Sequence, residues 1–222
     1  MMILFKDVSK HYDTHTALRK ISFFVEKGEM AFITGPSGSG KTTLLKLIYM
    51  AERPDEGEIT VGDWEVEKIK DSNIASLRRN IGVVFQDFKL LHNRNVFENI
   101  ALSLRIRGIT DERDIKGHVF DALKTVNLRH KADNFPNTLS GGEQQRIAIA
   151  RAIVSEPMII LADEPTGNVD PDTSTGIIRT LKEINTKGTT IILATHNREL
   201  FRNTGRRVLK LDFGNFSGEE IG

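Results

Sequence analysis

The chain of 222 residues is long enough for one sizeable hydrophobic core or two small ones. Its 31 Lys and Arg residues balance its 30 Asp and Glu residues, and a net charge of +1 argues against a nucleic-acid-binding protein, which usually carries a basic excess. The absence of cysteine excludes a disulfide framework and a thiolate metal site.

The sequence contains no candidate for a signal peptide or a membrane-spanning helix. The N-terminal stretch MMILFKDVSK reaches its first charge after five residues, which is too early for the apolar core of a signal peptide. No apolar run approaches the ~20 residues that a membrane-spanning helix needs. We therefore expect a soluble chain that reaches a membrane only through a partner.

The first informative elements surround a glycine-rich turn. Met30–Thr34 has the apolar continuity of a buried strand, and the leucines after Lys41 form the apolar face of a helix. Between them lies the pattern Gly-x-x-x-x-Gly-Lys-Thr, in which backbone N–H groups, a helix N-terminus and a lysine all bind phosphate. A flexible turn before an ordinary helix is the alternative, but the order of strand, loop and helix favours a nucleoside triphosphate site. Its predicted residues are Gly35, Pro36, Ser37, Gly38, Ser39, Gly40, Lys41, Thr42 and Thr43.

Four short apolar runs predict buried parallel strands and hence an α/β fold. They are Met30–Thr34, Ile81–Phe85, Met158–Ala162 and Thr190–Thr195. Each run is too continuous for a strand with one solvated face. Ligands of an open α/β sheet bind beyond the carboxyl ends of its strands, so we expect the polar residues that follow these strands to meet at one site.

The polar residues after the strands have the chemistry of phosphate hydrolysis. We expect Asp163 to bind Mg²⁺ together with the Thr42 hydroxyl, and Glu164 to orient an attacking water or accept its proton. His196 can bind the γ-phosphate or the carboxylate that handles the water, and Gln86 can bind Mg²⁺ or the water. The alternatives are a capping or salt-bridged acid for Glu164, a structural histidine and a surface glutamine.

A second candidate anion site lies in the stretch TLSGGEQQRIAIARAIV. Ser140 and Glu143 have the spacing of a capping box, and the alanines that follow favour a helix. This places Ser140, Gly141 and Gly142 at a helix N-terminus with free backbone N–H groups. A well-capped helix with no ligand is the alternative.

The order of these motifs resembles the ATPase domain of the ABC family. The resemblance covers almost the whole chain and rests on Gly35–Thr42, Gln86, Leu139–Glu143 (LSGGE), Ile159–Glu164 (IILADE), Asn168–Asp170 and His196. It implies a single ATP-binding domain over residues 1–222 with a P-loop fold of the ABC type. Antiparallel strands are then expected in about residues 1–30 and 56–66, and a helical subdomain in about residues 88–156.

The resemblance also implies how the site works. Two chains form a homodimer when ATP binds, and each ATP lies between Gly35–Thr42 of one chain and Ser140–Gly142 of the other. Hydrolysis to ADP and phosphate depends on Mg²⁺, Glu164 and His196. Tyr12 corresponds to the aromatic residue that stacks on adenine, although a strand-edge tyrosine fits as well. Asp170 corresponds to the acid of a loop that connects the two sites.

Three stretches resemble the branch of this family that acts in bacterial cell division: Leu77–Leu102, NFPNTLSGGEQQRIAIARA and LADEPTGNVD. This branch implies an FtsX-like transmembrane partner, contact with division-ring proteins, and a place at the cytoplasmic face of the inner membrane. ATP-driven closure would then regulate cell-wall hydrolysis. The sequence leaves two alternatives open: an ATPase of a lipoprotein-release or macrolide/toxin exporter, and a soluble scaffold or ribosome-associated protein. Departures from the branch are Asn197, Tyr49–Met50 and the C-terminal tail.

Overall fold

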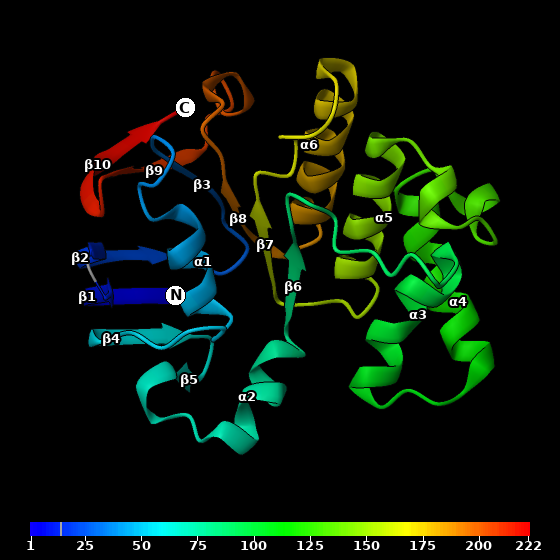
Figure 1. Ribbon diagram of the computed structural model, residues 1–222, viewed down its shortest axis with the longest axis horizontal. Helices are drawn as coiled ribbons and strands as arrows, with labels where there is room; N and C mark the ends of the chain where they lie inside the picture. The colour runs from blue at the N-terminus through cyan, green and yellow to red at the C-terminus, as the bar shows by residue number, and fades with distance from the viewer. Residues whose placement is uncertain (14) are drawn as a thin grey trace. The chain divides into compact units, whose positions relative to one another are not determined.

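The computed structural model describes residues 1–13 and 15–222, which divide into two compact units (Figure 1). The first unit contains both termini and comprises Met1–Arg78 and Asn185–Gly222. The second unit is the continuous segment Arg79–Ile184. No helix in the described part of the chain has both the length and the apolar character needed to cross a membrane.

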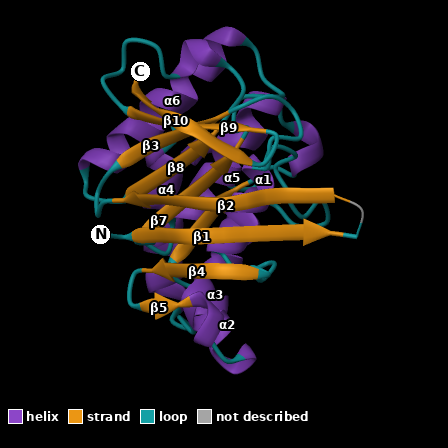
Figure 2. Ribbon diagram, turned by 90° about the vertical axis from the view of Figure 1, so that its left-hand side faces the viewer, coloured by secondary structure: helices purple, strands orange, loops and turns teal. Residues whose placement is uncertain are grey.

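The first unit contains an antiparallel sheet whose strands lie side by side in the order β2-β1-β4-β5 (Figure 2). Phe5 and Phe23 stack across the β1–β2 pair with ring centroids 4.7 Å apart, and Ile3, Val8 and Ile21 are buried on the same sheet. The elements of this sheet are β1 (Ile3–Tyr12), β2 (His15–Val25), β4 (Glu56–Val61) and β5 (Trp64–Glu65).

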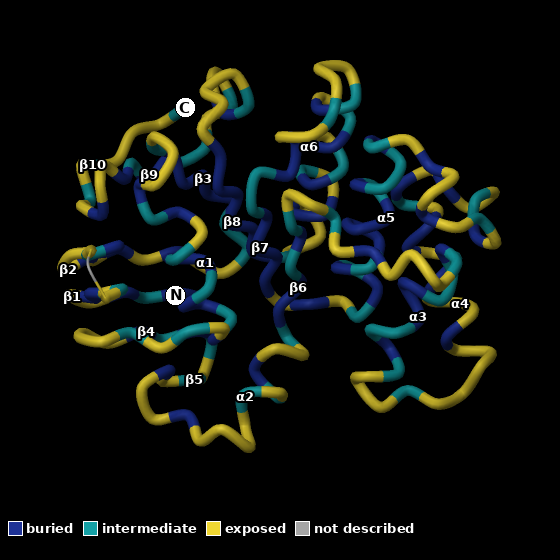
Figure 3. Tube along the Cα trace, viewed as in Figure 1, coloured by how far each residue is buried: buried dark blue, intermediate teal, exposed yellow. Residues whose placement is uncertain are grey.

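The same unit contains a second, mainly parallel group of strands. In this group β3 (Met30–Thr34) pairs in parallel with β8 (Thr190–Ala194) on one side and with β9 (Arg207–Asp212) on the other. β10 (Asn215–Ile221) pairs antiparallel with β9. Every residue of β3 and β8 is buried (Figure 3), as expected for parallel strands covered on both faces.

The helices of the first unit and the contacts between its sheets complete its core. The helices are α1 (Lys41–Ile48), α2 (Asp71–Arg78) and the short 3₁₀ turns Val66–Lys68 and Arg198–Leu200. Leu44, Leu45, Leu47 and Ile48 are buried and form the apolar face of α1. The turn before β10 joins β2, because the Arg19 N–H donates to the Gly214 carbonyl at 2.8 Å.

The second unit packs helices around a pair of parallel strands. The strands are β6 (Ile81–Val84) and β7 (Ile159–Asp163), with Val84 opposite Ala162. Helices α3 (Val96–Arg107), α4 (Glu112–Thr125) and α5 (Gly141–Ile153) pack against one another, and α5 also contacts β6. The unit also holds the 3₁₀ turns Arg129–Lys131 and Pro136–Thr138 and most of α6 (Pro171–Thr186).

The helices of the second unit begin at residues that the sequence rules favour. Asn95 caps α3 by accepting the Glu98 N–H, and Asp111 caps α4 by accepting two N–H groups of its first turn. Ile115, Val119 and Leu123 are fully buried along one face of α4.

The α/β fold with mainly parallel strands is confirmed. The four expected strands are present and differ from their predicted bounds by one residue at most. The one consequential shift places Asp163 within β7, as its last residue, rather than after it. The proposed division of residues 1–222 into an antiparallel part, a sheet core and a helical subdomain stays a prediction.

Candidate nucleotide-binding site

The phosphate-binding loop follows the central strand of the parallel group in the first unit. Because β3 lies between β9 and β8, its last residue, Thr34, is opposite Lys210. On the other side the Thr195 N–H donates to the Ile33 carbonyl at 2.9 Å, which carries the pairing to the residue before His196. The start of the loop, the part of β9 that contains Lys210 and the turn that contains His196 therefore lie at the same edge of this group of strands, beyond the carboxyl end of β3.

Lys41 is buried and its ammonium group lies against the start of the loop. Its Nζ donates to the carbonyl of Gly35 at 2.8 Å and to that of Pro36 at 3.0 Å. A buried cation held at the mouth of a helix N-terminus is suited to bind the terminal phosphates of a nucleotide.

Two positions of the loop accept only glycine. Gly40 has φ +100°, and a Cβ there would lie 2.6 Å from the Ala17 carbonyl oxygen and 2.7 Å from Leu18 Cδ2. At Gly35 an added Cβ would collide with the carbonyl of Leu211. The backbone therefore passes close to β2 and β9 at these two points, which a side chain would prevent.

The N-terminus of α1 is open toward an anion. Its first turn contains no acidic residue, and Gly40, as the N-cap, supplies no side-chain hydrogen bond. Ser39 is fully buried and its Oγ has no hydrogen-bond partner among the described residues. Thr42 is exposed and Thr43 is half-buried in the first turn of the helix. Uncapped N–H groups, a buried hydroxyl and the Lys41 ammonium together form a cradle for phosphate.

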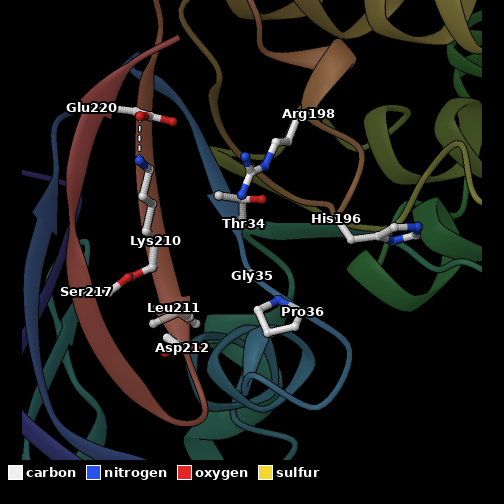
Figure 4. A pocket seen from close by; sticks show the side chains of 10 residues that line it. All are labelled: Thr34, Gly35, Pro36, His196, Arg198, Lys210, Leu211, Asp212, Ser217 and Glu220. Carbon is white, nitrogen blue, oxygen red and sulfur yellow. Dashed lines mark hydrogen bonds and ion pairs between the residues drawn. The ribbon is translucent and has the colours of Figure 1, made fainter.

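A pocket of about 400 Å³ adjoins this cradle (Figure 4). Gly35, Pro36 and His196 line it together with residues of β9 and β10. Lys210 and Glu220 form an ion pair of 2.5 Å at its far wall, and the ring of His196 points away from this pair. The structure therefore brings His196 next to the start of the phosphate loop, as the sequence predicts.

In the second unit the candidate hydrolytic residues lie at the carboxyl ends of β6 and β7. Asp163 ends β7, and its Oδ1 is buried. Glu164 follows with φ +45°, a left-handed conformation that is uncommon for glutamate and that the Gly167 N–H supports by donating to its carbonyl at 3.0 Å. Gln86 is exposed, and its carbonyl accepts the Asn168 side-chain amide at 2.9 Å. The chain therefore brings Gln86 and the Glu164–Asn168 turn together.

The second candidate anion site is a complete capping box at the start of α5. Ser140 Oγ accepts the Glu143 N–H at 3.3 Å, and Glu143 Oε2 accepts the Ser140 N–H at 2.9 Å. The Ser140 N–H is the main reason that the pKa of Glu143 lies below its ordinary value. Both the capped helix and the anion site fit this geometry, because the capping box uses the N–H groups of Ser140 and Glu143 and does not involve those of Gly141 and Gly142.

The loop before α6 lies beside this helix start. A Cβ on Gly141 would lie 3.2 Å from the Asn168 carbonyl oxygen, and one on Gly142 would lie 2.5 Å from Thr173 Cγ2. Asp170 acts as the N-cap of α6, since its carboxylate accepts the Thr173 N–H at 2.9 Å. Hydrogen bonds from Thr173 hold the pKa of Asp170 below its ordinary value. The carboxylate of Asp170 therefore has a structural role in addition to the role that the sequence suggests.

The proposed magnesium ligands are oxygen donors of the kind that Mg²⁺ prefers. The Thr42 hydroxyl is exposed at the start of α1, and Gln86 and Asp163 follow or end neighbouring parallel strands. Within residues 1–13 and 15–222 no group of three His, Asp or Glu residues could hold a metal ion. Magnesium in nucleotide sites is usually held by one or two protein oxygens and the phosphates, so the donor set fits the ion.

Three residues contribute to the site in ways that no sequence pattern predicts. Arg151 of α5 donates to the carbonyls of Phe88 and Lys89 at 2.7 and 2.6 Å, and so holds the segment that follows Gln86. Lys210 lines the pocket beside the phosphate loop. Glu52 binds the hydroxyl of Tyr12, the half-buried last residue of β1. Each contact joins residues far apart in the sequence, where no local pattern could indicate it.

Comparison with known proteins shows that this chain is similar to ATP-binding cassettes. The profile of the ABC transporter family matches residues 18–167. The cell division ATP-binding protein FtsE of Bacillus subtilis (strain 168) is 48% identical over 214 residues, which cover 96% of this chain and 93% of that protein. FtsE of Escherichia coli (strain K12) is 47% identical over 218 residues, or 98% of each chain. FtsE of Mycobacterium tuberculosis (strain H37Rv) is 43% identical over 99% of this chain and 96% of its own length.

Two solved structures of similar shape are dimeric structures of one cassette. MJ0796, described as a bacterial ABC transporter cassette, has a dimeric structure with a TM-score of 0.92 and 37% identity, covering 99% of this chain and 98% of that one. The same cassette in a dimeric post-hydrolysis state bound to ADP and Pi has a TM-score of 0.91, 36% identity and the same coverage.

Proposed function

This chain belongs to the ABC transporter family, and we propose from that membership that it hydrolyses ATP as the ATPase subunit of an FtsE–FtsX type complex in bacterial cell division. The FtsE proteins described above are similar over nearly their full length, which favours cell division over lipoprotein release or export. The proposed place is the cytoplasmic face of the inner membrane, reached through an FtsX-like transmembrane protein. Division-ring proteins are further proposed partners.

The phosphate cradle of the first unit is the observation that carries the ATPase proposal. Lys41 is buried against the Gly35 and Pro36 carbonyls, and α1 begins without an acidic residue or a side-chain cap. A buried lysine and a helix N-terminus without a side-chain cap together stabilise a polyphosphate anion. The residues proposed to contact ATP are Tyr12, Gly35 to Thr43, Gln86, Asp163 and Asp170, with Ser140 to Gly142 from the second chain of a homodimer.

Five residues of this chain are proposed to carry out hydrolysis. Glu164 orients the attacking water and accepts its proton, and His196 binds the γ-phosphate. Thr42, Gln86 and Asp163 would hold a Mg²⁺ ion, which would neutralise charge on the phosphate oxygens. ATP closes the dimer because its γ-phosphate is bound by both chains, and loss of phosphate removes that bridge. Opening and closing then move the transmembrane partner, with residues near Gln86 as the proposed contact.

Substitution of Glu164 tests the hydrolytic assignment. Glu164→Gln keeps the shape of the side chain but removes the base, so we expect ATP turnover to fall by about 10²-fold or more. An ATP-bound dimer should accumulate, measured by light scattering after gel filtration with Mg²⁺-ATP. Glu156→Gln is the matched control, because Glu156 is exposed and lies before β7; its turnover should equal that of the parent.

Hydrolysis at the parent rate by Glu164→Gln would remove Glu164 as the base and favour a scaffold that needs no turnover. A Mg²⁺-ATP complex of this variant that stays monomeric with its transmembrane partner present would contradict the shared-ATP dimer. Co-purification from the native membrane separates the two cellular roles. A four-span FtsX-like partner supports cell division, whereas a partner with a large periplasmic export domain supports an exporter.

A further inference from the structure

A carboxylate that follows α1 holds the hydroxyl group of Tyr12. The Tyr12 hydroxyl donates to Oε2 of Glu52, 40 residues further along the chain. Oε1 of the same carboxylate accepts from Nζ of Lys46 at 2.9 Å. The Glu52 side chain is only 22% exposed. Both carboxylate oxygens are therefore engaged, in a partly buried position where charge-assisted hydrogen bonds are stronger than on an open surface.

The ionisation states of Glu52 and Tyr12 favour the hydrogen bond between them. Burial by itself raises the pKa of Glu52, but the hydrogen bonds from Tyr12 and Lys46 outweigh it and leave the pKa below its ordinary value. Burial and the hydrogen bond to Glu52 raise the pKa of Tyr12, while a hydrogen bond to Thr43 opposes the rise. At neutral pH the carboxylate is thus charged and the phenol keeps its proton, so Tyr12 donates and Glu52 accepts.

A second carboxylate, that of Asp55, lies in the same segment between α1 and β4 and binds the two residues of β1 that precede Tyr12. Asp55 accepts the His11 N–H at 2.6 Å and the Lys10 ammonium at 3.1 Å. The Lys10 ammonium also lies 5.7 Å from the centroid of the Tyr12 ring, and the His15 ring stacks on Tyr12 at 5.5 Å. Contacts to the His11 backbone, the Tyr12 ring and the Tyr12 hydroxyl therefore hold the end of β1 in place.

These contacts connect Tyr12 to the helix that carries the phosphate cradle. Lys41 and Lys46 both belong to α1, and Glu52 binds Lys46 with one oxygen and Tyr12 with the other. We propose that Glu52 is a positioning residue that holds the Tyr12 ring at the separation from the phosphate cradle that a nucleoside triphosphate spans. This inference rests on the proposed function, in which the Tyr12 ring stacks on the adenine.

The test compares ligands with and without a base. Glu52→Met keeps the length of the side chain and removes both acceptors, and Tyr12→Phe removes the donor but keeps the ring. We expect each variant to raise the Kd of Mg²⁺-ATP by about tenfold, part of the full effect of losing a stacked base. Inorganic tripolyphosphate should bind as it does to the parent, because it has phosphates but no base. For Glu52→Met the KM for ATP should rise while kcat stays within about twofold of the parent.

Glu58→Met is the matched control, since Glu58 of β4 is exposed and its carboxylate pairs with Lys6 of β1. The double variant Tyr12→Phe/Glu52→Met should bind ATP no more weakly than either single variant, because both break the same hydrogen bond. Isothermal titration calorimetry gives all these constants, and thermal unfolding shows that each variant is folded.

Tyr12→Ala separates failure of this inference from failure of the proposed stacking. If Tyr12→Ala weakens ATP binding while Glu52→Met and Tyr12→Phe bind like the parent, the positioning role is wrong and the stacking role stands. Equal ATP binding by Tyr12→Ala and the parent would remove both roles. Loss of tripolyphosphate binding in Glu52→Met, to the same degree as ATP binding, would also overturn the proposal, because Glu52 would then act on the cradle itself.

Discussion

The packing of Gly142 against α6 leads to a quantitative prediction. A Cβ added at this position would lie 2.5 Å from Thr173 Cγ2, 3.2 Å from its Oγ1 and 3.4 Å from its Cβ. Ordinary contacts between carbon atoms are about 3.5–4.0 Å, so one side must move by ~1 Å. Rotation of Thr173 about χ1 gives only partial relief, because Cβ carries two heavy atoms and at least one of them stays in one of the two crowded positions.

The cost of Gly142→Ala follows from two opposing effects. Overpacking of this kind costs about 1–3 kcal/mol. Alanine favours a helix over glycine by up to ~1 kcal/mol in the interior, and by less in the first turn, where Gly142 lies. We therefore expect the free energy of unfolding to fall by about 1–2 kcal/mol. For a chain of this length the Tm should fall by roughly 2–8 °C, measured by circular dichroism.

Two further variants make this prediction specific. Gly117→Ala is the matched control, because Gly117 lies inside α4 and nothing stands within 4 Å of an added Cβ; it should raise the stability by about 0.5–1 kcal/mol. Thr173→Ser removes the obstructing Cγ2, so the double variant Gly142→Ala/Thr173→Ser should recover about 1 kcal/mol relative to additivity. A Gly142→Ala protein as stable as the parent, or one that Thr173→Ser fails to rescue, would refute the steric argument.

Two more predictions concern contacts between distant residues. Arg151→Lys should lower the free energy of unfolding by about 2 kcal/mol in urea titration, because lysine lacks the planar fork whose two terminal nitrogens each reach one of the Phe88 and Lys89 carbonyls; Arg146→Lys on the same helix is the control and should change little, and equal effects would contradict this role. Asp55 has a pKa held below its ordinary value, first by the His11 N–H, so it stabilises the fold above the pKa of its unfolded state, near 3.8. The stability difference between the parent and Asp55→Asn should be constant from pH 7 to about pH 5 and shrink as the pH falls through the folded pKa; a difference that grows on acidification would contradict this sign.

The local motifs of the site are predictable because short-range physics determines them. The capping box at Ser140 and Glu143 forms from residues three apart, whose side chains bind each other's backbone. The loop before Lys41 needs glycine where the backbone passes close to other strands, and Gly40 is left-handed as such a turn requires. The four buried strands are recognisable because each is apolar on both faces.

Other features of the site are visible only in the folded chain. Asp163 lies within β7 instead of after it, one residue beyond Ala162, which is the last residue that pairs with β6. Residue type alone does not determine where this strand ends. The Asp170 cap of α6, by contrast, is a local contact, because the Thr173 N–H that its carboxylate accepts is three residues away. The family resemblance assigns Asp170 a different role, in communication between the two sites.

The sequence by itself determined the phosphate loop, the capped helix starts and the parallel strands, because these depend on hydrogen bonds and periodicities within a few residues. Only the tertiary structure decided that β3 lies between β8 and β9, that Glu52 binds Tyr12 and that Arg151 holds the segment after Gln86. Those contacts join residues 40 or more positions apart. Many distant partners of suitable charge exist in the sequence, and only the packing of the strands and helices selects among them.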